Sequence, residues 1–138
     1  MLSTFTVIGG KASDDLAKKI ANKLKGKHIK SELRIFPDGE SKITIIGKPK
    51  NDKVVVVQST YPPVDSNLMQ ALSLVSKARK HSSQVYVVIP YLGYARQDKE
   101  FLPGEVITMS LVANMFKDRK STRLNSSHIQ KSRMPSSA

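Results

Sequence analysis

The sequence predicts an α/β fold, a three-layer sandwich in which helices cover both faces of a mostly parallel sheet. Residues 54–57 are four consecutive valines, and residues 85–89 form a second apolar run. Short runs of this kind are typical of strands that are buried on both faces. Segments with apolar residues at helical spacing alternate with these runs along the chain. Such alternation favours a parallel sheet with helices packed on both sides.

A strand and a helix are predicted at the start of the chain. Residues 5–8 are an apolar run that Gly9 and Gly10 end, which predicts a first buried strand. Ser13 then offers an N-cap hydroxyl, and two acidic residues follow it at the positive end of the helix dipole. The helix stops near Gly26. Its apolar residues recur at four-residue spacing and are Leu16, Ile20 and Leu24.

The next segment has the pattern of two strands joined by a turn. Residues 28–35 and 42–46 both alternate between apolar and polar, with a Pro-Asp-Gly turn sequence between them. We therefore expect a strand-turn-strand excursion around residues 30–46. A later helix is predicted over residues 106–116.

Length and composition describe a chain of one domain. Its 138 residues include 39% hydrophobic side chains, enough for a core. It has no apolar run of the roughly 18 residues that a membrane span needs, and its first residues lack the features of a signal peptide. The absence of cysteine excludes disulfides and thiolate metal sites, which fits a reducing cytosol. We therefore expect a cytoplasmic protein with no membrane partner.

The chain is strongly basic. Its net charge is +12, and 18 basic against 10 acidic residues still leave +8 before residue 118. Such a charge attracts phosphorylated small molecules or nucleic acid. Aromatic residues do not interleave with the basic ones and no recognition motif is present, so we expect no nucleic-acid partner. A solvated helix face explains the lysine-rich segment, which holds Lys18, Lys19, Lys23, Lys25, Lys27 and Lys30.

The periodic patterns stop at residue 118. Residues 118–138 have neither helix nor strand periodicity and begin where an α/β fold needs its next strand. A disordered basic tail is one interpretation. We favour a second one, because the segment resembles translated adapter sequence at the end of a contaminated gene model. We therefore predict one N-terminal domain over residues 1–117 and a non-native or disordered tail over residues 118–138.

Several familiar catalytic motifs are absent from the sequence. It holds no P-loop, no Gly-x-Gly-x-x-Gly and no nucleophile elbow. His28, His81 and His128 are too far apart for metal-ligand spacing, and His128 lies in the tail. The sequence therefore does not support nucleophilic or zinc chemistry, and we expect no metal held by the protein alone.

The first candidate site is the turn at residues 34–40. Phe36 offers a ring on which an adenine can stack, and Asp38 or Glu40 offers a carboxylate to accept from its exocyclic amine. The same residues suit an ordinary hairpin turn with solvated acids. The residues alone leave both interpretations open.

The second candidate site, residues 90–99, directly follows a buried strand. Ligands of open α/β sheets bind beyond the carboxyl ends of the strands. Arg96 offers planar donors for phosphate oxygens, Gln97 offers an amide and Lys99 a point charge. Asp98 suits either the orientation of Arg96 or the binding of a hydrated magnesium ion. A surface loop with a local ion pair is the alternative.

The two segments together resemble ribose-phosphate diphosphokinases, the enzymes that make phosphoribosyl diphosphate. The resemblance lies in Phe-Pro-Asp-Gly-Glu at residues 36–40 and Tyr-Ala-Arg-Gln-Asp-Lys at residues 94–99. It runs in order from Val7 to Phe116, and the part after Gln97 looks most like archaeal members. It also includes residues 57–60, 67–69 and 104–108.

The resemblance implies a type I phosphoribosyltransferase-like fold in two similar halves. It implies transfer of a diphosphoryl group from Mg-ATP to ribose 5-phosphate, with release of AMP. In the family the adenine loop reaches across a subunit boundary, so a homo-oligomer is expected. The residues that match ATP-binding positions are Phe36, Asp38, Gly39 and Glu40 at the adenine, Arg96 and Gln97 at the phosphates, and Asp98 and Lys99 in the ATP and Mg²⁺ neighbourhood.

The sequence departs from the family after its last predicted helix. The histidine-containing magnesium motif, the loop with the catalytic lysine and the ribose 5-phosphate loop of the family are absent. We therefore expect an ATP-binding half with no catalytic residue, which lacks the C-terminal ribose 5-phosphate domain and does not turn over by itself. The alternative is a non-catalytic regulatory or scaffolding subunit of the same family that docks on complete enzymes.

Overall fold

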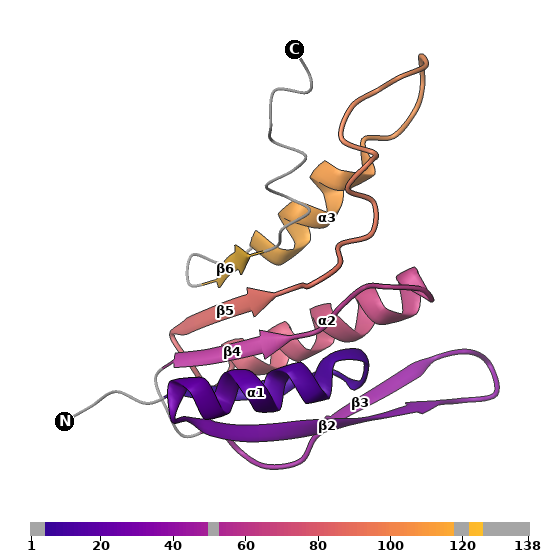
Figure 1. Ribbon diagram of the computed structural model, residues 1–138. Helices are drawn as coiled ribbons and strands as arrows, with labels where there is room; N and C mark the ends of the chain where they lie inside the picture. Colours follow the sequence, from indigo (N-terminus) through magenta and orange to yellow (C-terminus); the bar gives the residue numbers. More distant parts are fainter. Residues whose placement is uncertain (1–4, 50–52, 118–121, 126–138) are drawn as a thin grey trace.

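The computed structural model describes residues 5–49, 53–117 and 122–125, which form a six-stranded sheet with three α-helices. The strands lie side by side in the order β3-β2-β1-β4-β5-β6 (Figure 1). Their bounds are β1 Phe5–Gly9, β2 Lys27–Ile35, β3 Ser41–Ile45, β4 Lys53–Val57, β5 Gln84–Val88 and β6 Thr122–Asn125. The helices are α1 Asp14–Leu24, α2 Val64–Arg79 and α3 Thr108–Lys117, and a 3-10 turn, Lys11–Ser13, precedes α1.

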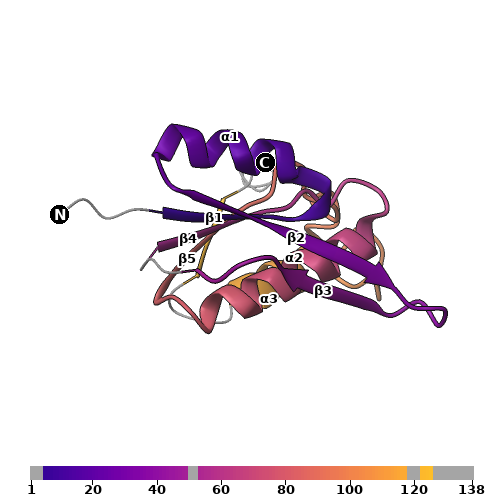
Figure 2. The same cartoon turned by 90° about the horizontal axis from the view of Figure 1, so that it is seen from below.

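Helices cover both faces of this sheet, as the sequence predicts. Figure 2 shows α1 on one face and α2 with α3 on the other. Alternate residues of β4 serve two separate cores, because side chains of a strand point to opposite faces in turn. Val54 and Val56 belong to the core under α2 and α3, and Val55 and Val57 to the core under α1. No helix of the described ranges is long and apolar enough to cross a membrane.

The sheet is parallel apart from one hairpin. Strand β1 pairs in parallel with β2 and β4, and β4 with β5. Strands β2 and β3 are antiparallel, with Arg34 opposite Lys42 and Ile35 opposite Ser41. The hairpin projects beyond the parallel strands (Figure 1). The predicted excursion around residues 30–46 is therefore confirmed.

The start of α1 differs from the expected cap. Ser13 holds the N-cap position, but its side chain makes no capping hydrogen bond. Its Oγ instead accepts a hydrogen bond of 2.9 Å from the backbone N of Ser59, just beyond β4. The expected cap is wrong because the hydroxyl serves a partner that is distant in sequence, and it ties the helix to the end of the central strand.

A short strand lies where the sequence pattern predicts none. Strand β6 pairs in parallel with β5, with Val85 opposite Thr122 and Val88 opposite Asn125. The expectation of no strand after residue 117 is wrong over these four residues. The open edge of β5 presents backbone donors and acceptors that any short extended segment can satisfy, without an apolar pattern. Residues 118–121 and 126–138 lie outside the described residues, so the interpretation of the tail stays a prediction.

Close packing explains the two glycines at the end of β1, Gly9 and Gly10. A Cβ atom on Gly10 would overlap the side chain of Gln58, and one on Gly9 would overlap Asp14 and Ala17. Gly10 N also donates a hydrogen bond of 2.8 Å to Val57 O. The pair therefore lets the chain pass between β4 and α1.

The buried face of α3 yields a stability prediction. Phe116 is fully buried in the core under α2 and α3, whereas its neighbour Met115 is 37% exposed. We expect Phe116→Ala to lower the free energy of unfolding by about 3–5 kcal/mol, because it removes a buried ring and leaves a cavity. Met115→Ala is the matched control and should cost less than about 1 kcal/mol. Urea unfolding measures both, and equal losses would contradict the packing of α3.

Candidate functional site

The first predicted segment forms the tip of the β2–β3 hairpin. Phe36 N donates to Glu40 O at 2.8 Å, and Gly39 N donates to Phe36 O at 2.9 Å. Asp38 Oδ1 accepts a hydrogen bond of 3.0 Å from Glu40 N. Gly39 has a φ of +94°, a conformation that glycine adopts without the strain of a side chain. The tip is therefore a closed turn whose shape is set by its own backbone.

The side chains of this tip are open to solvent. Phe36 is half-buried, and the Arg34 guanidinium lies 5.1 Å from the centre of its ring. Asp38 and Glu40 are exposed. Within the described part of the chain, the Glu40 carboxylate has no hydrogen-bond partner, whereas Asp38 already holds a backbone N–H. Glu40 thus has the freer carboxylate for a ligand.

The second predicted segment lies in the loop that follows β5. Ile89, Leu92 and Ala95 are buried and anchor this loop in the core under α2 and α3. Arg96 and Gln97 follow directly and are exposed, as are Asp98 and Lys99. The side chains that can bind a ligand therefore come straight after a rigidly held stretch.

Backbone hydrogen bonds connect this loop to α3. Gln97 N donates to Tyr94 O at 2.9 Å, and Gln97 O accepts from Met109 N at 3.0 Å. The Glu105 carboxylate accepts from Phe101 N and Leu102 N, both at 3.0 Å. An open hollow of about 480 Å³ lies against the loop. Its lining consists of Arg96, Gln97, Lys99, Phe101, Glu105, Val106 and Thr108.

The alternative of a local ion pair finds no support in the described residues. Among the described residues, the ion pair is formed by His28 Nε2 and Asp14 Oδ1 at 2.9 Å. These two residues are far from the loop in the sequence. Asp98 does not orient Arg96 through a hydrogen bond, and Lys99 Nζ lies 5.3 Å from the centre of the Phe101 ring. Arg96 is exposed, and its guanidinium has no ion-pair partner among the described residues.

Sequence reasoning missed a pair of residues that supports the second segment. Tyr94 has a left-handed φ of +69°, and its hydroxyl donates a hydrogen bond to Asp65 Oδ1 at the start of α2. This bond, together with burial and the carboxylate charge, raises the pKa of Tyr94 above its ordinary value. No pattern in the sequence connects residues 65 and 94, so the pairing could not be foreseen.

The two predicted segments lie at separate places along one edge of the sheet. The hairpin continues β2 and the loop continues β5, and β1 and β4 lie between those strands. At a strand spacing of about 4.8 Å, β2 and β5 are about 14 Å apart. Figure 1 shows the hairpin tip and the loop after β5 well separated. One chain does not bring its two predicted segments together.

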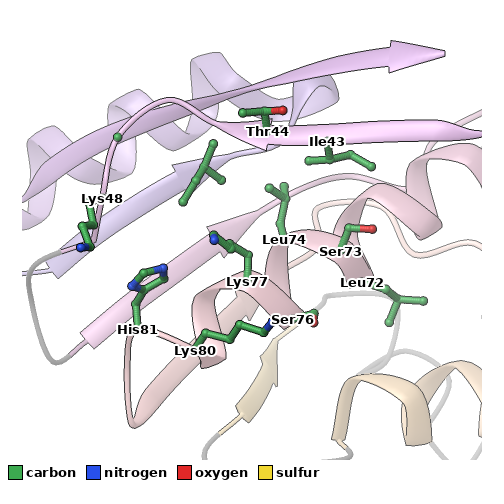
Figure 3. A pocket seen from close by; sticks show the side chains of 12 residues that line it. Ile43, Thr44, Lys48, Leu72, Ser73, Leu74, Ser76, Lys77, Lys80 and His81 are labelled. Carbon is green, nitrogen blue, oxygen red and sulfur yellow. The ribbon is translucent and has the colours of Figure 1, made fainter. Parts of the chain in front are cut away.

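Another hollow lies away from both segments, between β3 and α2. It has a volume of about 750 Å³ and includes none of the predicted site residues. Figure 3 shows Lys48 and His81 at one end of it and Ile43, Ser73 and Leu72 at the other. Lys77 and Lys80 add positive charge. Across the described ranges, no three His, Asp or Glu side chains are grouped as they would be around a metal.

Comparison with known proteins gives the family. A family profile described as the N-terminal domain of ribose phosphate pyrophosphokinase matches residues 5–119. The ribose-phosphate pyrophosphokinase of Methanobrevibacter smithii is 44% identical over 110 residues, which are 79% of this chain and 37% of that enzyme. A putative ribose-phosphate pyrophosphokinase 1 of Enterococcus faecalis is 40% identical over 122 residues, or 88% of this chain and 38% of that protein.

A solved structure agrees with these relatives. The crystal structure of phosphoribosylpyrophosphate synthetase from Mycobacterium smegmatis superimposes with a TM-score of 0.79 at 26% identity. The match covers 94% of this chain and 45% of that chain. The chain belongs to the ribose-phosphate pyrophosphokinase family, in the part that forms the N-terminal domain. It spans little more than a third of the length of the two curated relatives. Ribose-phosphate diphosphokinase is another name for ribose-phosphate pyrophosphokinase, so the resemblance found in the sequence is confirmed.

The Tyr94 hydroxyl yields a prediction on pH. Its pKa is raised in the folded chain, so the stability from its hydrogen bond is present below pH 10 and is lost as the pH rises through the folded pKa. We expect Tyr94→Phe to be less stable than the wild type near neutral pH, with the difference shrinking above about pH 10. Urea unfolding from pH 8 to 11 measures this difference. A constant difference across that range would show that the hydroxyl does not hold Asp65.

Proposed function

We propose that this chain binds ATP with Mg²⁺ as the nucleotide half of a ribose-phosphate pyrophosphokinase. In the complete enzyme, the diphosphoryl group of that ATP would pass to ribose 5-phosphate to give phosphoribosyl diphosphate and AMP for nucleotide biosynthesis. The observation that carries the proposal is the placement of Arg96 and Gln97, exposed at the carboxyl end of β5 on a loop anchored in the core. In open α/β sheets this is the edge where ligands bind.

The loop after β5 has the charge and the exposed donors that binding the phosphates of ATP would require. Arg96 offers a planar set of donors without a described carboxylate partner, and Gln97 adds an amide. Lys99 lines the same hollow and adds a compact positive charge. Phosphoryl transfer depends on positioning and on neutralising the phosphate oxygens, which these residues supply in part.

The hairpin tip suits the adenine. The Phe36 ring offers an apolar face for stacking, and Arg34 lies against the same ring. Glu40 has a carboxylate free to accept from the exocyclic amine, and Gly39 lets a base approach the backbone because nothing lies within 4 Å of a Cβ placed there.

The residues present fit a magnesium ion that arrives with the nucleotide. Mg²⁺ is commonly held by one or two carboxylates together with substrate phosphates. Asp98 is exposed beside Arg96 and Gln97 and is the carboxylate of this loop that would contact it. When bound, the ion supplies charge neutralisation at the phosphates.

A complete nucleotide site requires a second chain under this proposal. The strands that carry the two segments, β2 and β5, are about 14 Å apart by strand spacing, and the hairpin tip extends away from the parallel strands (Figure 1). A homo-oligomer would bring the Phe36 tip of one chain to the Arg96 loop of another. The chain by itself would bind nucleotide without turnover. We place it in the cytoplasm, because a chain without cysteine fits a reducing compartment.

Single substitutions test the nucleotide site. We expect Phe36→Ala and Arg96→Ala each to weaken Mg-ATP binding by roughly 10- to 100-fold, because each removes a stacking or a charge-assisted contact. Lys18→Ala is the matched control for Arg96→Ala, since it removes one positive charge from the exposed side of α1. Titration calorimetry with and without Mg²⁺ measures the affinities. Folded wild-type chain that binds no ATP at millimolar concentration would refute the proposal.

A mixing experiment tests whether the site is shared. Neither Phe36→Ala nor Arg96→Ala chains should bind ATP tightly alone. In mixed dimers one of the two sites keeps both native residues, so a one-to-one mixture should regain about a quarter of the wild-type sites if each site uses two chains. No recovery after subunit exchange would show that both residues act within one chain.

A further inference from the structure

Thr60 lies just beyond the end of β4 and beneath the loop that carries Arg96. It is 1% exposed, so its side chain cannot reach a ligand in solution. A hydroxyl can donate one hydrogen bond and accept others, and burying it without partners is unfavourable. The contacts of this hydroxyl therefore indicate what it does.

Three hydrogen bonds join Thr60 to the loop after β5. Thr60 N and Thr60 Oγ1 both donate to Tyr91 O, each at 2.9 Å. Thr60 Oγ1 also accepts a hydrogen bond of 2.7 Å from Gly93 N. The one hydroxyl thus binds both sides of the turn formed by residues 91–93, and it does so across 33 positions of sequence.

Close packing leaves this turn little room to move. A Cβ atom on Gly93 would overlap the Val64 side chain and lie 3.5 Å from Thr60 Oγ1. Tyr94, the next residue, is held in its left-handed conformation while its hydroxyl binds Asp65. Residues 91–94 are therefore packed against Thr60 and the first turn of α2, and Arg96 follows two residues later.

We propose that Thr60 is a positioning residue for the phosphate-binding loop, which places Arg96 and Gln97 through its hydroxyl without touching the nucleotide. The inference rests on the proposed function of Arg96 and Gln97. The physical reason is that charge-assisted hydrogen bonds to phosphate are directional, so a small displacement of the loop weakens several of them together. When a distant substitution displaces a catalytic group by about 1 Å, the rate of a reaction that depends on orientation can fall by up to about 100-fold.

Two substitutions of Thr60 separate its hydroxyl from its bulk. Thr60→Val keeps the shape and removes the hydroxyl, and we expect it to weaken Mg-ATP binding by about tenfold or more. Thr60→Ser keeps the hydroxyl and should bind within about twofold of the wild type. Affinities are measured by calorimetry on the full 138-residue chain, well below the melting temperature of each variant. Amide exchange at Gly93 should accelerate in Thr60→Val and not in Thr60→Ser.

Ser59→Ala is the control for a simple loss of stability. Ser59 is also buried, and its hydroxyl accepts from Tyr61 N at 3.2 Å, whereas the Thr60 hydroxyl bonds to residues 91 and 93. It should lower the melting temperature and leave the affinity for Mg-ATP unchanged. If Thr60→Val does not fold, Thr60→Cys replaces it, because a thiol is a weaker hydrogen-bonding group of similar size.

The outcomes test the positioning role of Thr60 separately from the proposed binding of ATP. Loss of affinity in Thr60→Val with retention in Thr60→Ser and Ser59→Ala supports the positioning role. Thr60→Val or its thiol replacement binding as tightly as Ser59→Ala would overturn it, while an effect of Arg96→Ala would leave the proposed function standing. Normal binding by Arg96→Ala would overturn the proposed function and this inference together.

Discussion

The structure depends on the burial of β4 between two cores. This central strand lies between β1 and β5, and Val54 to Val57 are buried on both of its faces. Removing such apolar surface from water is the main favourable contribution to folding. The residues beyond its end are buried as well, although Gln58, Ser59 and Thr60 are polar. Burial forces these polar groups to find partners within the protein, and the partners they find are the loops at the carboxyl edge of the sheet.

Each of these polar residues forms hydrogen bonds to a different segment near that edge. Gln58 Oε1 accepts from Ala12 N at 3.2 Å, and Gln58 Nε2 donates to Gln70 Oε1 at 2.6 Å, so this side chain links the 3-10 turn before α1 to α2. Ser59 N donates to Ser13 Oγ. Thr60 holds the turn at residues 91–93. The loop that presents Arg96 is thus held by hydrogen bonds to a residue that directly follows a buried strand, whereas the Phe36 tip projects at the end of the β2–β3 hairpin (Figure 1). Under the proposed function, the loop held by Thr60 would bind the phosphates, and the projecting hairpin tip would reach the adenine bound at a neighbouring chain.

Most of the fold was predictable because its signals are local. Four consecutive valines, the alternation around Pro37 to Gly39 and the four-residue spacing of Leu16, Ile20 and Leu24 each report on neighbours in the sequence. The Ser13 cap and strand β6 were not predictable for the opposite reason. Ser13 Oγ accepts a hydrogen bond from Ser59 N, 46 positions away, and β6 pairs with the edge of β5 although its own residues have no strand periodicity. Tyr94 and Asp65 form their hydrogen bond across 29 positions. Such contacts follow from the order of the strands, which no local pattern contains.

The sequence by itself determined the layered α/β architecture, the two candidate segments around Phe36 and Arg96, and the family to which they point. Apolar periodicity and short motifs suffice for these because both are written in consecutive residues. Only the tertiary structure decided where the segments lie relative to each other, which exposed side chains lack partners, and which buried residues hold the Arg96 loop. Strand order places β1 and β4 between the strands that carry the two segments, and the pairing of β4 with β5 brings the buried Thr60 hydroxyl to its partners in the loop after β5.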